Sequence, residues 1–396
     1  MGGDRFDAVI AGGGLSGLSL AAHLARLGWG DRSVLVVDDE QARPSARCWG
    51  YWSAGRGLLE AAVARRYEHV QVHAAGVSRR LPLGRYRYHV VRRPDLRTVV
   101  DSMVEGCPDF ELRSGRVEHV GADADGATVS IDGESVRAGW VFDSVSAAAA
   151  VTPVDAWLAF TGWQLRADRP VFDPTAPVLF DFRTAQAGGA RFVYVLPDGP
   201  RQALVELTEF VPRAGTPASP AQRRAAVATY LDEVVGLAAY EVLHTESAVL
   251  PLHVSPVVRG RTRVVPIGAA AGLIKASTGY GYPRIQRDSA AIARSLVRYG
   301  HPFATPPVRR WYRLLDALLL DVLADDPAQL ELAFARLFAA NPPDRVLRFL
   351  DEASRLDQDL RIMASLPPVP YLRALARRVG RESRPASVKS ATRRGT

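Results

Sequence analysis

Apolar and polar residues follow two rhythms along this chain, one with the period of a strand and one with the period of a helix. A short apolar run, Asp7 to Ile10, passes through a glycine-rich turn into a helical pattern from Leu18 to Leu27. A second apolar run, Ser33 to Val37, ends in a group of acids that begins at Asp38. This order of strand, glycine loop, helix, strand and acid is typical of a Rossmann dinucleotide-binding fold.

The remaining pattern divides into β-rich and helical stretches. Short alternating pieces separated by turns run from Tyr67 to Val141, with one helix expected around Pro94 to Glu105. Stronger alternation from Trp157 to Phe210 predicts an antiparallel sheet with one covered face. A helix is expected from Pro220 to Val235, and helical periodicity dominates from Ile285 to Leu375. The two kinds of stretch alternate, which favours interleaved sub-domains.

The glycine-rich turn has the spacing of a dinucleotide fingerprint. Gly12 permits the tight turn out of the strand, Gly14 lets the backbone approach a pyrophosphate, and Gly17 lets helix and sheet pack closely. Leu15 and Ser16 complete the turn at the helix N-terminus, where unpaired N–H groups and the helix dipole favour phosphate. These five residues are therefore candidate cofactor contacts.

Asp38 supplies the acidic end of the same motif, 21 residues after Gly17. Its carboxylate is placed to accept the ribose hydroxyls and would disfavour a 2′-phosphate. Many flavoproteins begin with this fingerprint, so its place at the N-terminus favours FAD over NAD as the cofactor.

The pattern as a whole predicts an α/β fold in which a Rossmann-type FAD-binding domain is interleaved with an antiparallel-sheet substrate domain and C-terminal helices. The FAD-binding domain is expected to be discontinuous, formed by residues 1–150 and 255–300. Residues 151–254 would form the substrate sheet, and residues 301–380 a helical region facing substrate or membrane. The basic tail, residues 381–396, is expected to be disordered.

A second glycine-rich segment, Val264 to Ser289, predicts a strand, a loop of small residues and a helix under the flavin. Ala269 stands where flavin hydroxylases usually carry an acid, which argues against an ordinary monooxygenase. Lys275 shares the chain with a single other lysine, and is either a cofactor contact or a surface residue. The candidate cofactor contacts of this segment are Gly268, Ala269, Lys275, Thr278, Gly279, Tyr280 and Gly281.

Composition narrows the function classes. With 396 residues, 47% of them hydrophobic, the chain can form two substantial cores. The net charge of +8 comes from scattered arginines without a basic stripe interleaved with aromatics, so nucleic-acid binding is not expected. The chain has no apolar run of about 20 residues and no signal-peptide pattern, so a cytoplasmic location is expected. Cys48 and Cys107 lack metal-site spacing, and no metal is expected.

Five segments spread over nearly the whole chain carry a resemblance to a known family. They are RCWGYW at 47–52, FDPTAPVLFDFR at 172–183, YVLPDGPRQALVELTEF at 194–210, the glycine-rich segment GAAAGLIKASTGYGYPRIQRDS and NPPDRVLRFLDE at 341–352. In this order they resemble the lycopene cyclase family, FAD-dependent carotenoid cyclases of bacteria and plants, and the bacterial β-cyclase type in particular. The glycine-rich segment resembles the family's C-terminal flavin motif.

The resemblance implies a reaction that needs reduced FAD, with NAD(P)H as the priming reductant, but has no net redox change. An acid protonates a terminal double bond of lycopene or a related polyene, and the cation closes an ionone-type ring. Glu206 in ALVELT matches the family's glutamate motif and is the expected acid, with a solvent-facing glutamate as the alternative. Plant-type members carry a second glutamate where this chain has Leu207. Glu246 is either a second carboxylate of the site or a surface residue.

Other interpretations of the flavin site stay open at this stage. One is an FAD-dependent redox enzyme, either a monooxygenase or a prenyl reductase, which would consume NAD(P)H in proportion to substrate. Another is a flavin-binding protein without catalytic activity, and a third is a cyclase of a shorter terpenoid. Pocket length, the number of rings formed, the double-bond position and the oligomeric state are not readable from the sequence.

Two groups of apolar residues bear on how a hydrocarbon substrate would be handled. A helical stripe from Trp311 to Val322, flanked by Arg309, Arg310 and Arg313, could dock at a membrane interface, although most such stripes pack in cores. Peripheral attachment to the inner face of the membrane is therefore a hypothesis. Six aromatic residues either line a substrate tunnel or pack in a core, namely Trp49, Trp52, Trp157, Trp163, Phe180 and Phe182.

Overall fold

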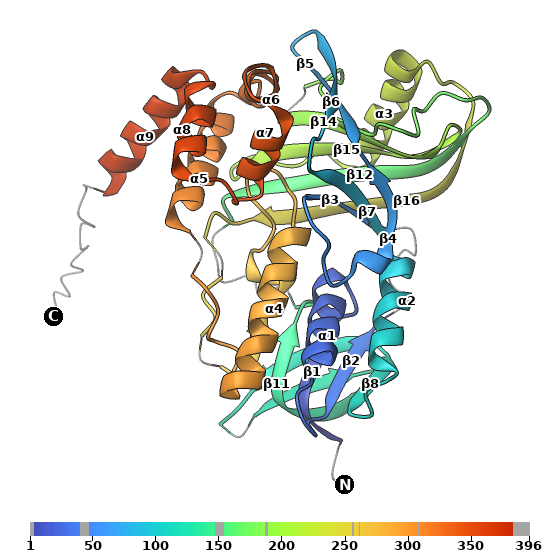
Figure 1. The fold of residues 1–396 in the computed structure, drawn as a ribbon, viewed down its shortest axis with the longest axis vertical. Coiled ribbons are helices and arrows are strands. Elements are labelled where there is room, and N and C mark those ends of the chain that lie inside the picture. The colour runs from blue at the N-terminus through green and yellow to red at the C-terminus, as the bar shows by residue number, and fades with distance from the viewer. Residues whose placement is uncertain are drawn as a thin grey trace, which may run out of the picture.

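Two large sheets, a small sheet and a group of C-terminal helices make up the described part of the chain (Figure 1). The computed structural model describes residues 4–39, 47–124, 126–146, 154–186, 189–255, 257–260, 262–307 and 309–382. The first large sheet lies next to the N-terminus, and the second lies above it in the view of Figure 1. The basic tail predicted at 381–396 lies outside the described residues from position 383 onward.

The first sheet confirms the predicted strand, glycine loop, helix and strand order. Strands β1 and β2 pair in parallel, and β1 also pairs in parallel with β11. Every residue of β2 is buried, because helices cover one face of the sheet and the strands β9 and β10 curl over the other. Its elements are β1 (Arg5–Ala11), α1 (Leu15–Leu27), β2 (Val34–Asp38), α2 (Arg93–Val104), β8 (Phe110–Ser114), β9 (Val117–Ala122), β10 (Ala127–Ile131), β11 (Glu134–Asp143), β17 (Val264–Pro266) and α4 (Tyr282–Tyr299).

The second sheet is antiparallel except where β13 meets β5, and its order is β16-β12-β15-β14-β13-β5-β6. The strands β5 and β6 belong to the first 150 residues, so this sheet draws on both of the units that the sequence predicted. Its strands are β5 (His69–Ala74), β6 (Val77–Pro82), β12 (Ala156–Ala167), β13 (Val178–Asp181), β14 (Ala190–Gly199), β15 (Gln202–Pro212) and β16 (Tyr240–Leu252). The small sheet comprises β3 (Cys48–Ser53), β4 (Val63–Tyr67) and β7 (Arg87–Arg92).

Both faces of the second sheet are covered, so the prediction of one covered face is wrong. Helix α3 (Pro220–Tyr230) packs on the face that carries Val205 and Leu207. The opposite face, which carries Leu204 and Phe210, packs against the small sheet and the C-terminal helices. The helix predicted to reach Val235 ends at Tyr230 and continues as a π-helical turn.

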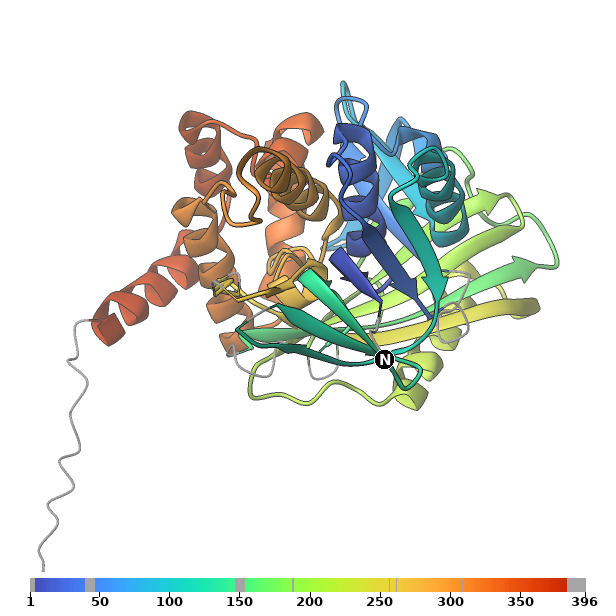
Figure 2. The same ribbon diagram turned by 90° about the horizontal axis from the view of Figure 1, so that it is seen from below.

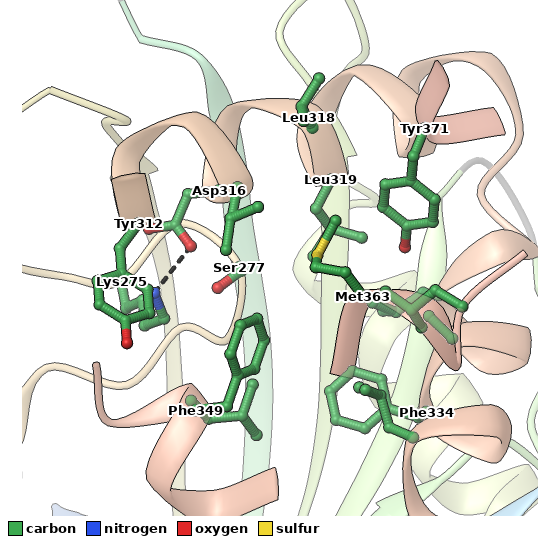
Figure 3. Close-up of a pocket in the computed structure, with 16 residues that line it drawn as sticks. Lys275, Ser277, Tyr312, Asp316, Leu318, Leu319, Phe334, Phe349, Met363 and Tyr371 are labelled. Atoms are coloured by element: carbon green, nitrogen blue, oxygen red, sulfur yellow. Dashed lines mark hydrogen bonds and ion pairs between the residues drawn. The ribbon is translucent and has the colours of Figure 1, made fainter. Parts of the chain in front are cut away.

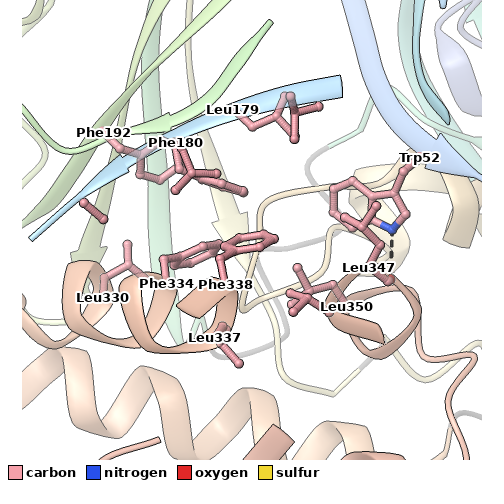
Figure 4. Packing of buried hydrophobic residues seen from close by; sticks show 14 of the residues in the cluster. Trp52, Leu179, Phe180, Phe192, Leu330, Phe334, Leu337, Phe338, Leu347 and Leu350 are labelled. Carbon is pink, nitrogen blue, oxygen red and sulfur yellow. Dashed lines mark hydrogen bonds between the residues drawn. The ribbon is translucent and has the colours of Figure 1, made fainter. Parts of the chain in front are cut away.

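The C-terminal helices pack on this opposite face through aromatic side chains. Phe334 meets Phe180 with ring centroids 4.2 Å apart, and the indole N–H of Trp52 donates to the Leu347 carbonyl at 3.1 Å (Figure 4). The helices are α5 (Arg310–Asp325), α6 (Gln329–Ala340), α7 (Pro343–Leu350), α8 (Leu356–Ala364) and α9 (Pro368–Glu382). None of the helices in the described residues combines the length and the apolar character needed to cross a membrane.

The helix α5 does not present the lipid-facing stripe that its periodicity suggested. Leu315, Leu318 and Val322 are buried, because α5 lies between α9 and the other C-terminal helices. Arg313 hydrogen-bonds the Ser255 hydroxyl and Arg309 donates to the Glu352 carbonyl at 3.3 Å. The stripe therefore belongs to the core, and a membrane contact would need another element.

Candidate active site

The glycine turn between β1 and α1 leaves no room for side chains. Gly12 has a φ of +105°, a conformation that L-residues rarely adopt. A Cβ atom at Gly17 would lie 1.9 Å from the Gly12 carbonyl oxygen, so helix and turn can meet only because this residue is glycine. Gly14 caps α1 and no side chain accepts a hydrogen bond from the first turn. The backbone N–H groups of Leu15 and Ser16 therefore begin a helix terminus suited to phosphate.

Asp38 lies buried at the end of β2, against the same turn. Its carboxylate accepts a hydrogen bond from the Gly13 N–H at 3.2 Å and forms ion pairs with Arg93 and, at 3.3 Å, with Arg97. A Cβ atom at Gly13 would lie 2.3 Å from the Asp38 carboxyl carbon. Gly13 was missed as a site residue, although a third consecutive glycine was the signal for it.

The second glycine-rich segment meets the first at Gly268. This residue has a φ of +64°, and a Cβ atom there would lie 2.4 Å from the Ser16 hydroxyl oxygen. Ala269 follows in a short 3-10 turn, Gly268–Ala271. The structure therefore brings together candidate cofactor contacts that are separated by about 250 positions in the sequence.

The loop that continues from this turn folds back on itself. The Lys275 carbonyl accepts from the N–H groups of Thr278 and Gly279 at 3.2 and 2.8 Å, and the Lys275 N–H donates to the Tyr280 carbonyl at 2.9 Å. Gly279 has a φ of +75°, and a Cβ atom there would lie 2.7 Å from Leu158 on β12. Gly281 then caps α4. The compact loop links the N-terminus of α4 to the second sheet.

The Lys275 side chain is buried in a cluster of charged residues. Its ammonium lies 2.8 Å from an Asp316 carboxylate oxygen (Figure 3). It also lies 2.9 Å from a Glu352 carboxylate oxygen, and Arg284 contacts both acids. The Lys275 and Arg284 charges hold the pKa of Glu352 down at about 2, against the opposing effect of burial. This cluster ties the loop to α5, and contact of Lys275 with FAD stays a prediction.

Glu206 and Glu246 converge across β12, the strand that lies between β15 and β16 in the second sheet. Glu206 on β15 and Glu246 on β16 both lie directly opposite Gly162 on β12, one from each side. A Cβ atom at Gly162 would lie 3.2 Å from the Glu206 carboxylate and 3.3 Å from the Glu246 Cγ. The missing side chain at Gly162 leaves the space in which the two carboxyl groups come within hydrogen-bonding reach of each other.

The surroundings of this carboxyl pair favour a shared proton. Burial and the neighbouring Glu246 carboxyl raise the pKa of Glu206 well above its usual range. Burial also raises the pKa of Glu246, while the Arg47 charge and the hydrogen bond with Glu206 oppose the rise. In the part of the chain that the structure describes, no arginine or lysine forms an ion pair with either acid. The pair therefore favours a state in which the two carboxyl groups share a proton.

Aromatic side chains surround the pair on the same face of the sheet. Tyr194 lies opposite Glu206 in the register of β14 and β15. The Tyr280 hydroxyl lies 3.4 Å from the Tyr88 hydroxyl, and the Tyr280 ring lies 4.5 Å from the Trp52 ring. Burial raises the pKa of Tyr280 to about 12, so its phenol stays neutral. Because Tyr280 belongs to the second glycine-rich segment, it links the candidate flavin site to the candidate acid.

The six aromatic residues predicted to line a tunnel separate into different environments. Trp52, Phe180 and Phe182 join the core cluster on the Glu206 side of the sheet. Trp163 is buried on the α3 side, whereas Trp49 and Trp157 are half-buried. Tyr88, Tyr194 and Gly162 were missed as site residues. An isolated glycine inside a strand signals close approach of another group, which was the available clue for Gly162.

The described residues contain no group of His, Cys, Asp and Glu side chains that could hold a metal ion. Cys48 and Cys107 are both free thiols. Burial raises the pKa of Cys48 well above its usual value, and the nearby carboxyl groups of Glu246 and Glu206 add to the rise. A thiol in this state is a weak nucleophile.

Solved structures with a similar fold include flavin enzymes. The chain superposes on a geranylgeranyl bacteriochlorophyll reductase-like protein from Thermoplasma acidophilum with a TM-score of 0.65 and 14% identity, covering 95% of this chain and 100% of that one. A flavoprotein/dehydrogenase from Cytophaga hutchinsonii gives a TM-score of 0.63 with 12% identity, covering 96% and 100%. At these identities the likeness establishes the fold, which is the predicted α/β arrangement.

Relatives in sequence narrow the family. A lycopene beta-cyclase of Pantoea ananas is 29% identical over 271 residues, 63% of this chain and 69% of that protein. A lycopene beta-cyclase of Pseudescherichia vulneris is 24% identical over 384 residues, 92% of this chain and 95% of that protein. The family model described as lycopene cyclase protein matches residues 7–376, and the chain therefore belongs to the lycopene cyclase family.

Proposed function

We propose that this protein is an FAD-dependent cyclase that forms ionone-type rings on lycopene or a related polyene without net redox change. The observation that carries the proposal is the Glu206–Glu246 carboxyl pair, which lies among aromatic side chains and forms no ion pair with an arginine or lysine of the described residues. Membership of the lycopene cyclase family and the lycopene beta-cyclase relatives support the substrate class.

The glycine-rich segments fit FAD in shape and in hydrogen-bonding groups. The turn at Gly12 to Gly17 would hold the pyrophosphate at the N-terminus of α1, and Asp38 would accept the ribose hydroxyls. The segment Gly268 to Gly281 would hold the flavin ring end through its backbone. Bound in its reduced, anionic form, with NAD(P)H as the priming reductant, FAD would supply negative charge beside a developing carbocation.

Glu206 would start the reaction by donating its proton to a carbon of a terminal double bond of the substrate. A new C–H bond forms, the O–H bond of Glu206 breaks, and a tertiary carbocation appears next to the resulting carboxylate. The neighbouring alkene then attacks this cation, and loss of a ring proton completes the product. One proton enters and one leaves, so no reductant is consumed. The raised pKa of Glu206 favours the protonated acid that this step needs.

The aromatic side chains would stabilise the carbocation and shield it from water. The rings of Trp52 and Tyr194 both pack against Tyr280, whose hydroxyl lies 3.4 Å from that of Tyr88. These rings would offer π faces to a cation at the Glu206 site. Such faces stabilise a cation by about 0.5–2 kcal/mol each. Because they exclude water, they would also protect the carbocation from capture as an alcohol.

Expression in cells that accumulate lycopene, followed by pigment analysis, tests the proposal. We expect cyclised carotenoids, and lycopene that persists while the purified protein carries FAD would contradict the carotenoid assignment. Assays with the purified protein would then separate the reaction classes. A cyclase needs reductant only to prime its flavin, whereas NAD(P)H consumption in proportion to product would favour a prenyl reductase. Conversion of a shorter polyene alone would favour a cyclase of another terpenoid.

A further inference from the structure

Four buried charged side chains attach the loop that carries Tyr280 to the helices around it. They come from four different elements and are called the Lys275 cluster: Lys275 of the loop, Arg284 of α4, Asp316 of α5 and Glu352 after α7. In Figures 1 and 2, α4 lies with the blue helix α1 on one side and the red helices α8 and α9 on the other. The cluster therefore joins the dinucleotide-binding part of the molecule to the C-terminal helices.

The Lys275 ammonium is fully engaged by this cluster. Only 6% of the residue is exposed, and the ammonium lies within 3 Å of both acids and 5.8 Å from the centre of the Tyr312 ring. Apolar side chains of α5, α6 and α7 line the cavity beside it, and ion pairs are stronger where such side chains exclude water. The side chain is therefore directed at the C-terminal helices.

The partner on the far side of the cluster has an unusual backbone. Glu352 has a φ of +61°, which residues other than glycine rarely adopt and which persists where the surroundings fix it. Its carbonyl accepts a hydrogen bond from Arg309 at 3.3 Å, while its carboxylate pairs with Lys275. The turn after α7 is therefore held in a conformation that presents Glu352 to the loop.

The backbone of Lys275 determines where Tyr280 lies. The Lys275 N–H donates to the Tyr280 carbonyl at 2.9 Å, and the Lys275 carbonyl accepts from the N–H groups of Thr278 and Gly279. Because these bonds close the loop on Lys275, a displacement of this residue would also displace Tyr280.

The small sheet is shaped to receive the Tyr280 side chain. The Trp52 ring lies 4.5 Å from the Tyr280 ring, and the Tyr88 hydroxyl lies 3.4 Å from the Tyr280 hydroxyl. A Cβ atom at Gly50 would lie 1.9 Å from the Tyr88 hydroxyl oxygen, so Tyr88 can reach this position only because Gly50 has no side chain. Contacts this close depend on an exact placement of the loop.

We infer that Lys275 is a positioning residue, whose side chain fixes the loop to α5 and to the turn after α7 so that the loop places the Tyr280 ring beside the Glu206 site. The proposal assigns the ammonium to Asp316 and Glu352 and gives it no contact with FAD. The effect of Lys275 on the reaction rests on the proposed function, whereas the placement of Tyr280 does not.

Lys275→Met tests this role, because it keeps the length of the side chain and removes its charge. Fluorine NMR of the full chain with a fluorinated tyrosine at position 280 should show a shifted or broadened signal. The dissociation constant of FAD should stay within about twofold of the wild type, and the cyclisation rate should fall by at least about tenfold. The matched control is Arg287→Gln on α4, which breaks a 3.2 Å ion pair with Asp351 whose arginine is 51% exposed, and none of the three readouts should change.

A double variant separates positioning from charge balance. Lys275→Met leaves two acids with one arginine, and adding Glu352→Gln restores the balance, so the denaturation midpoint should recover while the fluorine signal and the rate do not.

Three outcomes would overturn the proposal. They are an unchanged fluorine signal in Lys275→Met, a rate that recovers with the midpoint in the double variant, and FAD binding weakened at least about tenfold, as expected for an ammonium that contacts the cofactor. A wild type that cyclises nothing would refute the proposed function, and the fluorine signal and the FAD affinity would still decide the role of Lys275.

Discussion

Acidic side chains on the two faces of the second sheet have different partners. On the α3 face, Glu209 of β15 lies opposite Arg191 and accepts two hydrogen bonds from it, at 2.8 and 3.1 Å. On the other face of the same strand, Glu206 pairs with no arginine of the described residues and meets Glu246 instead. The two residues are three positions apart, so alternation sends their side chains to opposite faces.

This contrast separates structural acids from a reactive one. A carboxylate that is ion-paired and hydrogen-bonded can be buried in its charged form, and Asp181, bonded to Arg183 and Tyr230 on the α3 face, is another example. A carboxyl that is buried beside a second carboxyl is more easily kept protonated than charged. Such a group carries a cost in stability and is expected where a proton is to be given away.

Loss of the acidic proton of Glu206 should have the largest effect on the cyclisation rate. Glu206→Gln keeps the size of the side chain but cannot donate an acidic proton, so the cyclisation rate should fall by about 10²–10⁴-fold. Pigment analysis of the reconstituted enzyme measures the rate, and the FAD absorbance of the purified variant should be unchanged. Cyclisation at the wild-type rate would show that Glu206 is not the acid.

Substitution of the acid on the α3 face should lower the stability of the protein and leave the cyclisation rate unchanged. Glu209→Gln removes the charge that compensates buried Arg191, so the free energy of unfolding should fall by about 3 kcal/mol. Denaturant unfolding measures the loss. The folded fraction should retain its cyclisation rate, and a rate loss as large as that of Glu206→Gln would remove the distinction between the two faces.

The pH profile should reveal the partner of Glu206. Because the Glu246 carboxyl contributes to the raised pKa of Glu206, Glu246→Gln should move the loss of activity at high pH to a lower pH. Above that pH the rate should fall by about tenfold for each unit of displacement. A lower rate with an unmoved profile would assign Glu246 a structural role alone.

The same pair makes a prediction about stability. The pKa of Glu206 is higher in the folded chain than in the unfolded chain, so unfolding releases a proton between the two values. The free energy of unfolding should therefore decline as the pH rises through this window, and the decline should be smaller in Glu206→Gln, where only the buried Glu246 keeps a raised pKa. Denaturation midpoints measured across the window check both statements.

A methyl group added at Gly162, between the two carboxyl groups, should have the smallest effect. Gly162→Ala places a Cβ atom 3.2 Å from one carboxyl and 3.3 Å from the other side chain, so unfolding free energy should fall by about 1–3 kcal/mol. The loss of activity at high pH should move to a lower pH, as expected for Glu246→Gln, because the added methyl group separates the two acids. The control is Gly199→Ala on β14, where a Cβ atom meets nothing within 4 Å. Equal behaviour of the two variants would show that Gly162 does not set the approach.

The local motifs were predictable because their physics is local. A glycine turn between strand and helix constrains the backbone within a few residues, so Gly12, Gly14, Gly17 and the closing Asp38 were identified from spacing alone, and the structure brings them together. The α/β fold class, the antiparallel sheet and the C-terminal helices follow equally from periodicity. Glu206 was singled out by a family motif and not by its pattern, since alternation does not say which face is covered.

The tertiary structure decided everything that depends on which strands become neighbours. Glu246 was equally a surface glutamate or a site carboxylate until the register placed it and Glu206 on either side of Gly162. The helical period of the α5 stripe suits a membrane surface or a core equally, and packing against α9 and the other C-terminal helices alone buries it. Periodicity reports that a helix has an apolar face, whereas the partner of that face is a property of the whole chain.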